Sequence, residues 1–440
     1  MSHYRALVSR PELTAVHAAA PSDWPFLLDS ASRGDGLGRW SILMHADLDG
    51  PCLSAGFNDK HRFLDDFDRS WRASRRGQAG RFPFEGGWFV YLGYELAGAI
   101  EPTLQLPPAR DRLPVACARR CRAAILHDHQ LDQFWLVAED PPLLERLAEE
   151  LEQRAPVRRE VPGKCRPRVT ADDGQVFMDG VERIRNYILA GDVFQTNLSR
   201  AWHGRSGGHL DAVAIYRGLA LRNPAPFAGL ARLPGGTLLS SSPERLVSVR
   251  DGVIETRPIA GTRPRGSSPE QDRALSDELL AHPKERAEHI MLIDLERNDL
   301  GRICETGSVE VDELMVLESY AHVHHIVSNI RGRLEPGTSP SDVIRAVFPG
   351  GTITGCPKVR CMQIIAELET AGRSFYTGSM GYIGLDGRMD LNILIRSMLV
   401  SGSDVHFRTG AGIVVDSEPA AELAETEAKA RGLIKALGGQ

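Results

Sequence analysis

Paired cysteines, long apolar runs and an excess of one charge are all missing from this 440-residue chain. The seven Cys residues are odd in number, scattered and never spaced as Cys-x-x-Cys. That spacing argues against disulfides or a zinc site and indicates reduced thiols in the cytoplasm. No apolar run is long enough to cross a membrane, and residues 1–20 lack the pattern of a secretion signal. The net charge of −6 gives no reason to expect a nucleic acid as partner.

What is present is the composition of a soluble globular protein, with 42% hydrophobic and 25% charged residues. The sequence changes in character between residues 1–165 and residues 172–436, and the Arg- and Pro-rich segment 154–168 predicts a linker where they meet. Predicted strands come in clusters and do not alternate strictly with helices, so we expect an α+β fold. The predicted elements include a helix from Pro283 to about Leu300 and a strand over Leu391–Val400.

Two predicted helices each carry a pair of glutamates spaced three residues apart, so that both carboxylates of a pair share one helix face. The pairs are Glu285 with Glu288, and Glu422 with Glu425 near the C-terminus. Carboxylates from two helices are a usual way to hold Mg²⁺, which prefers oxygen ligands. The alternative is that all four are ordinary surface charges.

Ser242-Pro243-Glu244 follows a predicted strand backed by apolar residues. A carboxyl group in such a place is suited to act as a general acid, because an apolar environment raises its pKa. As an isolated triplet, Ser-Pro-Glu is more often a simple turn.

Two glycine-rich segments offer backbone N–H groups to an anion. Residues 349–358 open a helix but do not match a P-loop, and Cys356 within them is better explained as a packed thiol than as a nucleophile. Gly410-Ala411-Gly412 ends a strand, and Lys429 lies on the helix that follows. We expect these glycines and Lys429 to face a small anion.

Residues 319–327 contain three histidines, of which we expect one to face a pocket and the others to be structural. Arg396 stands in an otherwise apolar segment and needs a counter-anion if it is buried. A substrate carboxylate or a structural Asp would serve.

Several ordered motifs together resemble the chorismate-utilising enzymes, a family that includes anthranilate, aminodeoxychorismate, isochorismate and salicylate synthases. The resemblance covers about residues 175–435 closely. The motifs are Pro258-Ile259-Ala260-Gly261-Thr262-Arg263-Pro264, Asp294-Leu295-Glu296-Arg297-Asn298-Asp299-Leu300, Thr354-Gly355-Cys356-Pro357-Lys358 and the segment from Gly410 to Thr426.

The resemblance implies a large α+β fold with two facing sheets and outer helices, with residues 172–436 as the chorismate-binding catalytic region. It also implies Mg²⁺ held between chorismate and the carboxylates of Glu285, Glu288, Glu422 and Glu425, with Glu244 as the general acid. The implied chorismate pocket comprises Thr262, His325, Tyr382, Arg396, Gly410, Gly412 and Lys429.

Three positions bear on the reaction that the family resemblance implies. Gln195 stands where isochorismate and salicylate synthases carry a Lys that activates water, so ammonia is the expected nucleophile. Ala260 resembles anthranilate synthases, whereas typical aminodeoxychorismate synthases carry Lys there. The Asn197 in Gln195-Thr196-Asn197 and the loop Gly351–Gly355 resemble aminodeoxychorismate synthase component I, which we favour over anthranilate synthase component I.

The sequence contains no glutamine amidotransferase domain, so the resemblance implies a separate glutaminase subunit that supplies ammonia. Leu27-Leu28-Asp29-Ser30 resembles the segment that forms a tryptophan pocket in relatives, which would lie in the amino-terminal region 1–165. A catalytically dead binding scaffold would predict a broken carboxylate set, yet Glu244 and the four other glutamates are all present.

Overall fold

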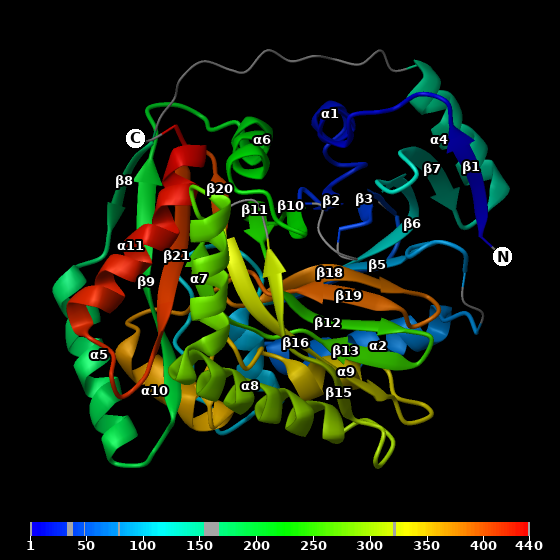
Figure 1. Ribbon diagram of the computed structural model, residues 1–440. Coiled ribbons are helices and arrows are strands. Elements are labelled where there is room, and N and C mark those ends of the chain that lie inside the picture. Colours follow the sequence, from blue (N-terminus) through cyan, green and yellow to red (C-terminus); the bar gives the residue numbers. More distant parts are fainter. Residues whose placement is uncertain are drawn as a thin grey trace.

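The strands form one continuous antiparallel sheet, which can be followed as a path from each strand to its hydrogen-bonded neighbour (Figure 1). The computed structural model describes residues 2–32, 38–47, 49–77, 80–153, 167–319 and 323–438, so most of the predicted linker 154–168 lies outside the described residues. The strands are β1 His3–Leu7, β2 Phe26–Asp29, β3 Trp40–Ala46, β4 Cys52–Ala55, β5 Gly87–Leu92, β6 Ala116–Asp128, β7 Gln133–Ala138, β8 Arg168–Ala171, β9 Gln195–Arg205, β10 Phe227–Leu233, β11 Gly236–Ser242, β12 Arg245–Arg250, β13 Val253–Thr256, β14 Ile259–Pro264, β15 Glu310–Ser319, β16 Val323–Arg333, β17 Gly355–Cys356, β18 Ser379–Gly384, β19 Met389–Asn392, β20 Ser397–Ser401 and β21 Asp404–Ile413.

The path has two arms. One arm runs β8-β9-β21-β20-β11-β10, and the other runs β5-β18-β19-β12-β13-β16, with β14 and β15 both paired to β16. Strands β2, β3 and β6 of the amino-terminal region join the two arms by pairing from β10 through to β5. In Figure 1 strands β8, β9 and β21 of the first arm stand upright at the left, and strands β18, β19, β12 and β13 of the second arm lie roughly horizontally to their right.

Helices cover the outside of both arms. They are α1 Leu13–Ala19, α2 Phe63–Ser74, α3 Ala97–Ile100, α4 Pro141–Gln153, α5 Gly174–Leu189, α6 Ala212–Arg222, α7 Pro269–Ala281, α8 Pro283–Gly301, α9 Pro340–Val347, α10 Lys358–Leu368 and α11 Pro419–Ala436. α5 and α11 pack on β9 and β21, and α8 packs on β14 and β16. The expected α+β fold with outer helices is confirmed, since the strands are antiparallel and the helices lie outside them.

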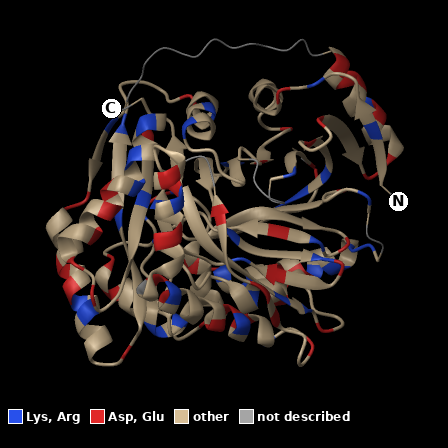
Figure 2. Ribbon diagram, in the orientation of Figure 1, with Lys and Arg blue, Asp and Glu red and all other residues tan. Residues whose placement is uncertain are grey.

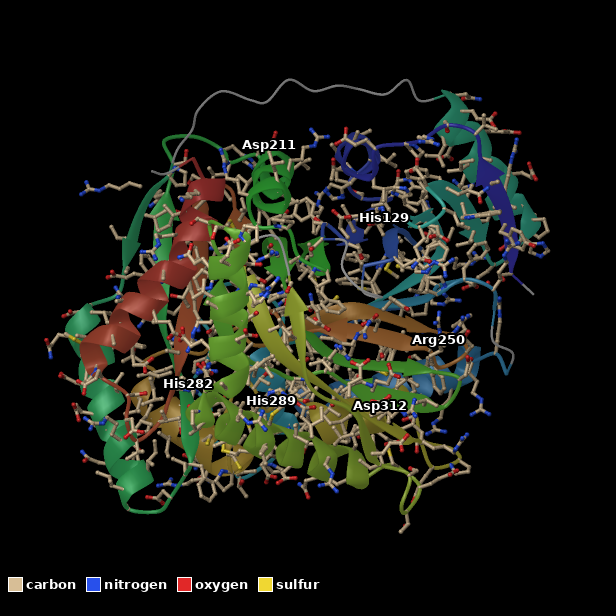
Figure 3. The ribbon with its side chains drawn as sticks, viewed as in Figure 1. His129, Asp211, Arg250, His282, His289 and Asp312 are labelled. Carbon is tan, nitrogen blue, oxygen red and sulfur yellow. The ribbon has the colours of Figure 1, made fainter. Side chains whose placement is uncertain are left out.

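α8 begins where the sequence predicts. Pro283 occupies the first turn, where its missing N–H is not needed, and the His282 side chain accepts from the backbone N–H of Glu285. Figure 3 labels His282 at this end of α8 and His289 farther along it. The helix carries Glu285 and Glu288 in its first turns. Acidic and basic side chains are mixed along α8 and α11, so neither helix presents a surface of one charge (Figure 2).

The prediction of one strand over Leu391–Val400 is wrong. The segment forms two strands, β19 and β20, separated by a short connection that ends at Arg396. The φ angle of Arg396 is +49°, which no extended strand allows for a side-chain-bearing residue. The residues on both sides of this turn are buried and therefore mostly apolar. The hydrophobicity of the sequence does not change at the turn and so does not reveal it.

The two regions expected from the sequence share a hydrophobic core. Trp88 and Val90 of β5 pack in one cluster with Val247 of β12 and Leu391 of β19. Backbone hydrogen bonds between β5 and β18 run across the same boundary. No helix of the described residues is long and apolar enough to cross a membrane.

Candidate active site

Glu244 lies in the short connection between β11 and β12, and its side chain is buried. Its Oε1 has no hydrogen-bond partner within the described part of the chain. Burial raises the pKa of Glu244 to about 7, against the opposing effects of the Thr352 hydroxyl and the positive charges of Arg396 and Lys429. A carboxyl group that keeps its proton near neutral pH can donate it, as a general acid must.

Arg396 is the cation whose charge acts on Glu244 from the turn between β19 and β20. Burial lowers the pKa of Arg396, and the Glu244 carboxylate is the group that opposes this effect. Its guanidinium forms no ion pair within the described ranges of the chain. A half-buried cation of this kind is prepared to receive an anionic ligand, because an unpaired charge is costly where little water reaches it.

His325 and Thr262 face each other across β14 and β16. The Thr262 Oγ1 and His325 Nδ1 atoms are 2.9 Å apart. Burial, helped by the charge of Arg396, lowers the pKa of His325 to about 4, so the imidazole is neutral at physiological pH. From the sequence, one histidine of residues 319–327 is expected to face a pocket, and the family resemblance implies that this histidine is His325. His324 instead binds Ser319 and Asp272, and His322 lies outside the described residues.

Gly410 and Gly412 of β21 leave room for side chains of β9. A Cβ on Gly410 would lie 2.8 Å from the Tyr376 hydroxyl and 3.0 Å from Asn197 Oδ1, and a Cβ on Gly412 would overlap the Gln195 amide. Only glycine therefore allows the two amides to lie against this strand. Gln195 Oε1 and Asn197 Oδ1 are buried without a hydrogen-bond partner among the residues that the structure describes. Two such acceptors are suited to receive N–H groups from a ligand.

Lys429 approaches the same strand from α11. Its Nζ donates to the carbonyl oxygen of Gly410 at 2.9 Å and pairs with Glu425 at 2.7 Å. The expected grouping of Lys429 with Gly410 is thus present in the structure.

Tyr382 does not join this group. Its ring packs edge-on against Phe84, and it lines a different cavity together with Arg245 and Asp390. The tyrosine that reaches the glycines is Tyr376, whose pKa burial raises to about 12. Tyr376 precedes β18, and Tyr382 lies within it. No sequence pattern distinguishes the two tyrosines, because the tertiary fold decides which one faces Gly410.

Ala260 lies in β14, buried and opposite Ile326. The register shifts between Ala260 and Thr262, where Gly261 has a φ of +72°. A Cβ on Gly261 would lie 2.9 Å from Glu285 Oε2. This bulge brings the glutamate of α8 close to the strand that carries Ala260 and Thr262.

The four glutamates predicted to hold a metal do not form one cluster. Glu285 pairs with Arg263 at 3.2 Å and Glu425 with Lys429 at 2.7 Å, while Glu288 lines a surface groove with Met291 and Val414. Within the described residues, no three His, Cys, Asp or Glu side chains lie together at metal-binding spacing. As a donor set, carboxylates on two helices fit Mg²⁺, and the ion pairs with Arg263 and Lys429 are the contacts that a metal would have to replace.

Sequence reasoning missed a second buried carboxyl group in this part of the molecule. Burial, helped by the charge of Asp299, raises the pKa of Glu296 to about 7, and the charge of Glu244 acts in the same direction. Glu296 stands on α8 among ordinary charged residues, so nothing in the sequence marks it as buried.

The cavity that Tyr382 lines has a volume of about 530 Å³ and lies between β2, β10, β12 and β19. Its wall includes Leu28, Asp29 and Ser30, the segment expected to form a tryptophan pocket. Both carboxylate oxygens of Asp29 already accept hydrogen bonds, from Ser41 at 2.7 Å and from Tyr216 at 2.9 Å.

We predict that Glu244 loses its proton near pH 7. The infrared absorption of a protonated carboxyl group, taken as the difference between the wild-type protein and Glu244→Gln, should disappear with a midpoint of about 7 as the pH rises. A midpoint near the ordinary glutamate pKa of about 4.3 would show that burial does not hold the proton on Glu244.

The chain is similar to known proteins in both sequence and structure. A family model described as chorismate binding enzyme matches residues 47–435. The chain is 42% identical over 370 residues to "Aminodeoxychorismate synthase component 1" of Bacillus subtilis (strain 168), covering 81% of this chain and 78% of that protein. It is 45% identical over 362 residues to "Anthranilate synthase component I-like protein" of Synechocystis sp., covering 81% and 74%. The crystal structure of anthranilate synthase component I from Streptococcus pneumoniae TIGR4 matches with a TM-score of 0.80 and 32% identity, over 90% of this chain and 92% of that chain.

Proposed function

The chain belongs to the family of chorismate-binding enzymes, and on that premise we propose that it is aminodeoxychorismate synthase component I. The proposed reaction replaces the C4 hydroxyl of chorismate with ammonia and gives 4-amino-4-deoxychorismate, the precursor of 4-aminobenzoate. The observation that carries the proposal is the pair of buried amide oxygens of Gln195 and Asn197, which have no hydrogen-bond partner among the described residues and lie beside the glycines of β21. Neither has a titratable amine to activate water, and both offer acceptors to ammonia.

In the proposed mechanism the substrate's carboxylates meet Arg396, Lys429 and the Gly410–Gly412 strand, which supply cations and backbone donors. Ammonia uses its lone pair to form the C–N bond while the C–O bond breaks. Glu244 gives its proton to the departing oxygen, which leaves as water, and the carboxylate of Glu244 recovers a proton from the new ammonium group. Because Ala260 has no amine, the substitution proceeds without a covalent adduct at that position.

Mg²⁺ is the cofactor that the family implies, and Glu285, Glu288, Glu422 and Glu425 are the residues that would hold it. When bound, the ion would neutralise a carboxylate of chorismate and fix its orientation. Arg263 and Lys429 are the cations that neutralise two of these glutamates in the structure.

Anthranilate synthase component I is the second candidate, and Ala260 is the observation that favours it. A small side chain at this buried position of β14 leaves space where typical aminodeoxychorismate synthases carry Lys. Relatives of both names match the chain at similar identity. For either reaction, the proposed partner is a separate glutaminase subunit that delivers ammonia.

Product analysis separates the two candidates. With chorismate, Mg²⁺ and ammonium chloride, we expect a product that yields 4-aminobenzoate only after aminodeoxychorismate lyase is added. Fluorescent anthranilate formed by the chain alone would instead establish the second candidate. Replacing ammonium by glutamine should give no product without the glutaminase. Ala260→Lys should change the kinetics if this position faces C2 of the ring.

We also propose the cavity lined by Leu28 and Ser30 as the place where tryptophan would bind. Its volume of about 530 Å³ lies within the usual range for a small ligand. Isothermal titration with tryptophan should give a saturable heat. A titration without heat would dismiss this site.

A further inference from the structure

Arg373 is a fully buried arginine in the segment that follows α10, with 2% of its surface exposed. Its guanidinium is held by the Glu369 carboxylate through Nε at 3.1 Å and Nη2 at 2.8 Å. Glu369 is in turn bound by Ser199 and Arg408 at 2.8 Å each. Both charges are therefore satisfied and held in one orientation.

Two further hydrogen bonds of Arg373 reach backbone carbonyls on different parts of the candidate active site, and Nη1 also donates to Thr377 Oγ1 at 3.3 Å. Nη2 donates to the carbonyl oxygen of Asn197 at 2.8 Å, on β9. Nη1 donates to the carbonyl oxygen of Ile353 at 3.1 Å, in the glycine-rich loop. The guanidinium also lies 5.7 Å from the ring centroid of Tyr376.

These contacts join segments that are far apart in sequence. β9 carries the amides of Gln195 and Asn197, and the loop carries Thr352, whose hydroxyl acts on Glu244. Tyr376 lies against Gly410. The planar fork of a guanidinium can satisfy acceptors in fixed directions, which the single ammonium of a lysine cannot do.

We propose that Arg373 is a positioning residue that holds the Asn197 strand, the Ile353 loop and Tyr376 in one fixed arrangement around the substrate. The inference rests on the proposed function for its kinetic consequences only. The arrangement itself follows from the hydrogen bonds of Arg373. A buried Arg–Glu pair that only stabilises the fold would have no reason to contact three segments of one site.

Arg373→Lys tests the proposal, with Arg120→Lys as a matched control. Arg120 is also buried, pairs with Glu139 at 2.6 Å, and donates to the carbonyls of Gly87 and Cys121 at 2.9 Å each, away from the site. Both variants should lose thermal stability to a similar degree. Hydrogen exchange should become faster in peptides covering residues 194–199 and 350–356 in Arg373→Lys only. Unchanged exchange in these peptides would overturn the proposal whatever reaction the enzyme catalyses.

The kinetic readout separates positioning from stability. In Arg373→Lys, kcat should fall by about 100-fold, as small misplacements of reacting groups cause. KM for ammonium should rise more than KM for chorismate. The lost hydrogen bond frees the part of β9 that carries Asn197, whose amide is the proposed acceptor for ammonia. The alkaline limb of the pH–rate profile should move to lower pH, since a looser loop admits water to Glu244. Equal losses in both variants, with no shift of the limb, would reduce Arg373 to a structural residue. Absence of any aminated product from the wild-type enzyme would count against the proposed function and leave the exchange result to decide the role of Arg373.

Discussion

Replacing Glu244 by Gln should reduce amination of chorismate by about 1000-fold while leaving chorismate binding nearly unchanged. General acid catalysis contributes about 10²–10⁴-fold, and hydroxide is a poor leaving group without a proton. Glutamine keeps the size and the neutral charge of the protonated side chain, so the pocket keeps its shape. Turnover with ammonium chloride and direct measurement of chorismate binding would check both parts.

Glu296→Gln is the matched control for this variant. Burial raises the pKa of Glu296 to about 7, as it does for Glu244, and the side chain is equally enclosed. We expect Glu296→Gln to keep most of its activity, because Glu296 donates no proton to the substrate in the proposed mechanism. A loss equal to that of Glu244→Gln would show that replacing the carboxyl group by an amide at either place is enough to disrupt the site, and would contradict a specific role for Glu244.

The same pair of variants also bears on stability. A carboxyl group whose pKa is raised from about 4.5 to about 7 on folding contributes stability that is fully present below pH 4.5 and lost as the pH rises to about 7, because over this range the unfolded state gives up the proton that the folded state keeps. The wild-type protein should therefore lose thermal stability between about pH 4.5 and pH 7 more steeply than Glu244→Gln. Melting temperatures measured across this range would show the difference.

Arg396→Met should raise KM for chorismate by about 100-fold. Hydrogen bonds to charged groups contribute about 1.5–3 kcal/mol, and each 1.4 kcal/mol is a factor of ten in binding. Methionine fills much of the same half-buried space but offers no donor to a carboxylate. The measurement is the dependence of the initial rate on chorismate concentration at saturating ammonium.

Arg396→Lys distinguishes charge from geometry at this position. Both variants place a non-glycine residue at the φ angle of +49°, so backbone strain is the same in each. Lysine keeps the positive charge but loses the planar fork, and its KM should fall between those of the wild type and Arg396→Met. An unchanged KM in Arg396→Met would show that Arg396 does not contact the substrate.

Much of the local structure could be predicted from the sequence. The helix from Pro283 occurs as expected, because a proline in the first turn favours the start of a helix within a few positions. Turns that depend on distant packing could not be predicted. Arg396 forms a turn within a mostly apolar segment and acts on Glu244 from there, and the periodicity of the sequence contains no sign of this turn.

The spacing of Glu422, Glu425 and Lys429 on one helix predicts that the three face the same way, since helical geometry alone sets which side chains are neighbours. The tertiary structure decides what they meet: Lys429 binds Glu425 and the carbonyl oxygen of Gly410.

The sequence motifs and their order were enough to place this chain with enzymes that bind chorismate, because several motifs in the same order over about residues 175–435 rarely match a family by chance. Only the tertiary structure decided that Tyr376, and not Tyr382, lies against Gly410, and that Arg373 connects Asn197 to Ile353. These contacts join segments separated by many residues, so they depend on how the two arms of the sheet are packed and not on any local pattern.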